Sequence, residues 1–138
     1  MIKFTNAAVL FCVVILGFAS LPAEAKPAPK IDPRLVGSWW NGVSDGNNQG
    51  TCTKWDFNND GTGMVSHYCT GMSFNFTVAG GKIKFSNAQN CGLERCSEVK
   101  MQDCKFSFSD DGQTLILGTE RLKKIVNGRV DGKWAGCC

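Results

Sequence analysis

The sequence predicts an all-β fold, an antiparallel up-and-down meander that closes into a barrel of about eight strands. Hydrophobic residues recur at every second position after residue 34, which is the periodicity of half-buried strands. Turn signals such as Asn59-Asp60-Gly61, Gly80-Gly81 and Asn127-Gly128 separate these segments and favour tight hairpins between antiparallel neighbours. No segment has the periodicity of an amphipathic helix.

Residues 1–25 have the pattern of a secretory signal peptide. Lys3 precedes an apolar run over residues 7–18, and the small-residue site Ala23-Glu24-Ala25 follows it. That run is 12 residues long, whereas a membrane-spanning helix needs about 20. We therefore expect cleavage after Ala25, secretion to the extracellular space and no membrane span.

Two regions follow the signal peptide. Residues 26–33 hold three of the four prolines and predict an extended leader outside the fold. Residues 34–138 form the predicted β-barrel domain. Residues 87–97 lack a strand pattern and predict a loop stapled by Cys91 and Cys96. The expected strands are 35–43, 51–57, 63–70, 72–79, 82–86, 99–108, 114–118, 121–126 and 129–134.

Seven of the eight cysteines lie after the signal peptide, and in an oxidising compartment they predict a disulfide-stabilised domain. An odd number leaves one thiol that stays free or links two chains into a dimer. A zinc site is not expected, because one close pair and the single histidine, His67, do not supply two tight ligand pairs. The disulfide candidates are Cys52, Cys69, Cys91, Cys96, Cys104, Cys137 and Cys138.

Charge and catalytic residues restrict the function further. The net charge of +3 is spread along the chain and predicts no nucleic-acid surface. His67 has no nucleophile or paired carboxylate in a recognisable motif, so we expect no enzyme, no metal and no cofactor. Asp56-x-Asn58-x-Asp60-Gly61 matches half of a calcium-binding loop, but His67 stands where the bidentate glutamate belongs, which favours a hairpin turn. Asn75 is a glycosylation candidate in Asn75-Phe76-Thr77.

A set of aromatic residues is expected to point into the barrel. Such side chains form a plain hydrophobic core, or they line a ligand pocket that is mostly apolar. Trp39 and Trp40 must face opposite ways, so one of them is exposed or closes a barrel end. The ligand-pocket candidates are Trp39, Trp55, Phe57, Phe74, Phe76, Phe106 and Phe108.

The segment Leu35-Val36-Gly37-Ser38-Trp39-Trp40 resembles the Gly-x-Trp opening of lipocalins and the wider calycin group. The hairpin segments 55–63 and 108–115 are similar to those of small lipocalin-like domains. The resemblance implies a barrel in which Trp39 closes one end, often under an arginine from a late strand, here Arg121 or Arg129. The layout also resembles bacterial inhibitors of secreted metalloproteases, in which an N-terminal arm, here residues 26–33, enters the protease cleft.

The sequence therefore predicts a secreted binding protein that takes a small hydrophobic ligand in the barrel. The alternative is a secreted protein-interaction module, a protease inhibitor or effector, whose partner is an extracellular protein. The two differ in where they place the site. The first uses the barrel interior, and the second uses the leader or the outer surface.

Overall fold

A computed structural model describes residues 30–42, 52–68 and 70–136. The predicted signal peptide, residues 26–29 of the predicted leader, and Cys69, Cys137 and Cys138 lie outside the described residues. Within the described residues, no helix has the length and apolar character needed to cross a bilayer.

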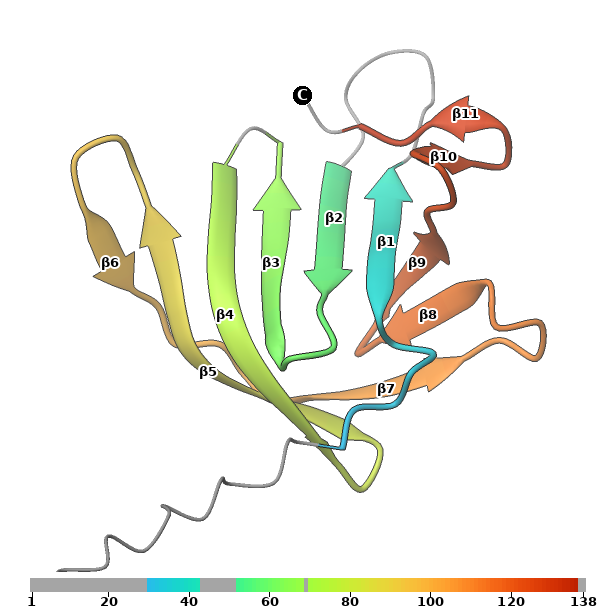
Figure 1. Cartoon of the computed structure of the whole chain (residues 1–138), viewed down its shortest axis with the longest axis horizontal. Coiled ribbons are helices and arrows are strands. Elements are labelled where there is room, and N and C mark those ends of the chain that lie inside the picture. The colour runs from blue at the N-terminus through green and yellow to red at the C-terminus, as the bar shows by residue number, and fades with distance from the viewer. Residues whose placement is uncertain (1–29, 43–51, 69, 137–138) are drawn as a thin grey trace, which may run out of the picture.

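Eight antiparallel strands close into a barrel (Figure 1). Neighbours in the wall follow the order β4-β3-β2-β1-β9-β8-β7-β5, and β5 pairs back onto β4. Short turns join most sequential strands, and Gly80 and Gly81 supply the positive φ angles of the β4–β5 turn. The all-β barrel prediction is confirmed. The barrel strands are β1 Gly37–Gly42, β2 Cys52–Phe57, β3 Thr62–His67, β4 Thr70–Ala79, β5 Lys82–Cys91, β7 Cys104–Phe108, β8 Thr114–Leu117 and β9 Glu120–Lys124.

Three short strands lie outside the barrel wall. β6, Cys96–Glu98, pairs with the distal part of β5, and a separate hairpin is formed by β10, Arg129–Val130, and β11, Lys133–Trp134. The single strand predicted over 129–134 was wrong, because Asp131 and Gly132 take positive φ angles and turn the chain. The strand predicted over 99–108 begins only at Cys104.

The loop predicted over 87–97 was wrong as well. β5 continues to Cys91 and pairs with β6, and the predicted Cys91–Cys96 link is a disulfide between these strands. A β-bulge explains the missed strand. Asn87 has a φ of 49°, and the β4–β5 register shifts beside it, so the in–out alternation changes phase there.

The core fills the centre of the barrel. Trp40 faces away from Trp39 and packs on the outside of the wall, where it is 9% exposed and its Nε1 donates to the Cys52 sulfur over 3.3 Å. Ile31, near the C-terminal edge of the predicted leader, packs against the core. The most completely buried large side chains are Leu35, Trp39, Phe57, Phe74, Phe76, Ile83, Leu115 and Leu122.

Candidate ligand-binding site

The seven predicted pocket aromatics all belong to the core or pack directly against it. Trp39, Phe57, Phe74 and Phe76 are 2% exposed or less. The Phe57 ring centroid lies 5.2 Å from that of Phe76 and 5.8 Å from that of Phe74, in edge-to-face geometry. Side chains shielded so completely leave no water-sized space beside them. Trp55, Phe106 and Phe108 are only partly buried, so they border the filled centre.

One end of the barrel, which we call the Leu35 end, is closed by the segment before β1. The Trp39 indole Nε1 donates to the Leu35 carbonyl oxygen over 2.9 Å, and both residues are fully buried. The Lys124 ammonium of β9 lies 5.6 Å from the Trp39 ring centroid, within cation–π range. The resemblance implied Arg121 or Arg129 in this place, but the structure puts Lys124 there, and both arginines are exposed.

Phe106 and Phe108 border a surface groove of 600 Å³ at the Leu35 end. The Arg34 guanidinium lies 4.8 Å from the Phe108 ring centroid and pairs with Asp32 over 2.7 Å. Hydrogen bonds from Arg34 hold the pKa of the Asp32 carboxyl below its usual value. Arg34 thus covers part of the apolar wall, and its charge is already paired.

The opposite end, the Glu120 end, is where β1 stops and β9 starts. Several interior hydrophobic side chains on this side of the filled centre remain partly exposed. An apolar lining that is incompletely covered is the usual composition of a small-molecule site. The side chains are Trp55, Met72, Phe85, Val99, Met101 and Cys104.

Two polar atoms among these apolar side chains are buried without a hydrogen-bond partner. They are the Trp55 Nε1 and the Glu120 Oε2. Glu120 faces the interior, because residues two apart on a strand share a face. Leu122, two residues later, is fully buried, and the Lys124 ammonium reaches the Trp39 ring. Native proteins rarely leave buried donors and acceptors unpaired. The two atoms are therefore the candidates here for hydrogen bonds to a bound molecule.

Ring contacts and strand register connect Trp55 to Cys104, and the charge of Glu120 acts on the Cys104 thiol. The Trp55 and Phe85 ring centroids are 5.9 Å apart. Phe85 follows Ile83 on the inner face of β5, and Ile83 is opposite Cys104 of β7. The Cys104 thiol is free, and burial raises its pKa, with further contributions from the charges of Asp103 and Glu120. Cys104 is therefore electrostatically linked to Glu120.

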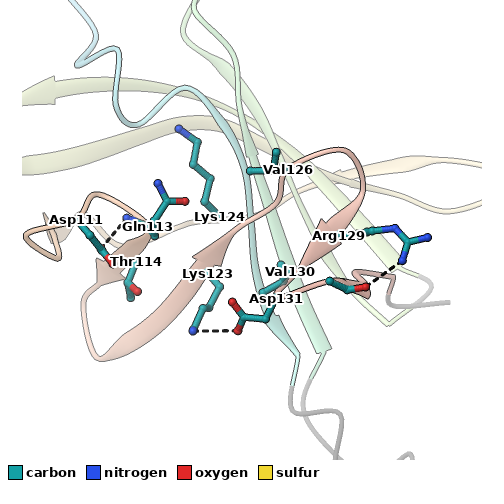
Figure 2. A pocket seen from close by; sticks show the side chains of 10 residues that line it. Asp111, Gln113, Thr114, Lys123, Lys124, Val126, Arg129, Val130 and Asp131 are labelled. Carbon is teal, nitrogen blue, oxygen red and sulfur yellow. Dashed lines mark hydrogen bonds and ion pairs between the residues drawn. The ribbon is translucent and has the colours of Figure 1, made fainter.

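A second hollow lies on the outside of the barrel, between the β8–β9 strands and the β10–β11 hairpin (Figure 2). Its volume is 340 Å³ and its lining is mainly polar. Lys123 pairs with Asp131 over 3.1 Å, and the Arg129 Nη1 donates to the Gly132 carbonyl over 2.9 Å. Asp111 accepts from the Gln113 backbone N–H over 3.0 Å. Most of the charged groups that line this hollow already have a partner within the protein.

The remaining sequence candidates lie apart from the Glu120 carboxylate. His67 ends β3 in an exposed position, with its Nδ1 3.1 Å from the Thr53 Oγ1. Asn75 is exposed on β4. Asp60 lies in the β2–β3 turn, where its carboxylate accepts from the Thr62 N–H over 2.9 Å, as expected of a hairpin. No group of three metal-ligating side chains occurs in the part of the chain that the structure describes.

Sequence reasoning missed Glu120, Phe85 and Met72 as site residues. The predicted strand began at Arg121, one residue after Glu120. Leu122 and Lys124 lie on the inner face, and extending this period-two pattern back by two residues would have placed the Glu120 carboxylate inside the barrel.

No family model, curated protein or solved structure matches the chain.

Proposed function

We propose that this chain is a secreted, lipocalin-like binding protein that takes a small apolar ligand at the Glu120 end of its barrel. The observation that supports this most directly is the pair of buried polar atoms without partners, Trp55 Nε1 and Glu120 Oε2. They lie among partly exposed apolar side chains. A ligand with an apolar body and a polar group would cover those side chains and supply a missing hydrogen bond.

The filled centre limits how deep such a ligand can reach. Trp39, Phe57 and Phe76 pack across the middle of the barrel, and displacing them would cost several kcal/mol, roughly what truncating one buried aromatic costs. The proposed site is therefore shallow. It rests on the inner faces of β2, β5 and β7 rather than running through the barrel.

Fluorescence titration with N-phenyl-1-naphthylamine, an uncharged apolar probe, tests the function. We expect saturable quenching of tryptophan emission, because Trp55 borders the site. Trp55→Phe keeps an aromatic ring but removes the indole, so most of the quenching should disappear. Trp134→Phe is the matched control, since Trp134 is 72% exposed on the β11 hairpin strand and should leave the quenching unchanged.

The two variants make the outcomes distinct. Quenching that survives Trp55→Phe and disappears in Trp134→Phe would move the site to the β10–β11 hairpin. An absence of saturable quenching in the unmodified protein would refute ligand binding in the barrel.

A further inference from the structure

The Glu120 carboxylate indicates the chemical class of the ligand. Glu120 Oε2 is shielded from water and accepts no hydrogen bond. Among the residues that the structure describes, the ion pairs are Arg34–Asp32, Lys54–Asp56 and Lys123–Asp131. None of them involves Glu120. A carboxylate oxygen that is shielded from water and accepts no hydrogen bond is unfavourable unless a further donor or positive charge reaches it.

The surroundings of Glu120 favour a cation that also has an apolar body. The Trp55 and Phe85 rings, 5.9 Å apart, offer π-faces that attract a positive charge. Cys104, near enough for the Glu120 charge to raise its pKa, is a small weakly polar neighbour with no competing positive charge. A metal ion would find fewer than three protein ligands here, since no cluster of three metal-ligating groups occurs in the described residues.

We propose that the site at the Glu120 end is selective for organic ammonium ligands, in which a protonated amine pairs with the Glu120 carboxylate and an apolar chain covers Trp55, Phe85 and Met72. This inference rests on the proposed function and narrows it to one ligand class. A charge-assisted hydrogen bond from the ammonium to Oε2 would fill the vacant acceptor. The Trp55 Nε1 remains available to an acceptor atom elsewhere on the ligand.

Three probes with the same apolar chain separate charge from hydrophobicity. Octylamine, octanol and octanoate are titrated into the full-length secreted protein by isothermal calorimetry at neutral pH. We expect octylamine to bind roughly 10–100-fold more tightly than octanol, the range of one hydrogen bond to a charged group. Octanoate should bind most weakly, because its charge repels the carboxylate.

Glu120→Gln then tests the carboxylate itself. This variant keeps the size of the side chain and removes its charge, so octylamine should lose its advantage while octanol binds as before. Glu98→Gln is the matched control, because Glu98 is exposed on β6, and it should leave all three affinities unchanged. The unfolding temperature of each variant, read in the same buffer, shows that it is folded.

The outcomes separate the two proposals. If octylamine and octanol bind equally in the unmodified protein, the ammonium inference is overturned and the binding function stands. The inference is overturned in the same way if Glu120→Gln preserves the preference for octylamine. If none of the three probes binds, the proposed function fails, and the inference fails with it.

Discussion

Replacing Glu120 with methionine should stabilise the barrel. Glu120→Met keeps a side chain of similar length but removes the buried Oε2, which accepts no hydrogen bond. An unsatisfied buried polar group costs about 1–3 kcal/mol. Because only one of the two carboxylate oxygens is buried without a partner, we expect the lower part of this range, a gain of about 1–2 kcal/mol in the free energy of unfolding.

Urea unfolding followed by circular dichroism measures this change. The midpoint should rise at an unchanged m value, which is the signature of altered stability alone. A domain of this size shifts by roughly 4–8 °C in Tm for each kcal/mol, so the thermal shift is easily resolved. Glu98→Met is the control, since Glu98 is exposed on β6 and surface substitutions stay within about 0.5 kcal/mol.

A lower midpoint for Glu120→Met would refute the reasoning, because it would mean that the carboxylate already makes favourable interactions within the protein. A gain in stability together with lost ligand binding is the pattern expected where function maintains an unfavourable group.

Three further predictions concern other parts of the barrel. Trp39→Phe removes the hydrogen-bond donor to the Leu35 carbonyl and leaves a void in the core. The free energy of unfolding in urea should therefore fall by about 2–4 kcal/mol. A fall no larger than that caused by Trp134→Phe would contradict this prediction. The raised pKa of the Cys104 thiol should make its alkylation by iodoacetamide at pH near 8 slower than that of a fully exposed thiol, and unfolding in urea should restore the rate. Mass spectrometry measures the rate, and an equal rate in the folded and the unfolded protein would contradict this prediction. Hydrogen bonds from Thr62 to Asp60 and from Ser109 to Asp111 lower the pKa values of these carboxyls below the ordinary 3.8. The stability that the two carboxylates contribute is therefore present above pH 3.8 and is lost as the pH falls through their folded-state pKa values. The double variant Asp60→Asn, Asp111→Asn should flatten the acid unfolding curve, and an unchanged curve would show that these two turns do not contribute.

The sequence predicted the barrel because its evidence is local. Period-two alternation in segments such as Phe74–Val78, and glycine pairs such as Gly80-Gly81, act within a few residues, and the structure confirms strands and a turn there. The disulfide between Cys91 and Cys96 is also local. These features need no knowledge of distant contacts.

The candidate site was harder to predict because it depends on long-range placement. The aromatic candidates were correctly assigned to the interior, but alternation cannot show that Trp39, Phe57 and Phe76 fill the centre while Trp55 borders it. The shielding of the Glu120 Oε2 and the effect of its charge on Cys104 depend on strands that are distant in the sequence and meet in the closed barrel. A charged residue at a strand end looks like a surface residue in the sequence.

The bulge at Asn87 makes β5 a strand of two opposite phases. Ile83 and Phe85 face inward before it, and Ala88, 2% exposed, faces inward after it. Deleting one residue here would restore a regular alternation, and Ile83, Phe85 and Ala88 would still share the inner face. The bulge therefore holds one extra residue in β5 without turning a core side chain outward. The strand can differ in length by one residue at this point while the aromatic core keeps its side chains.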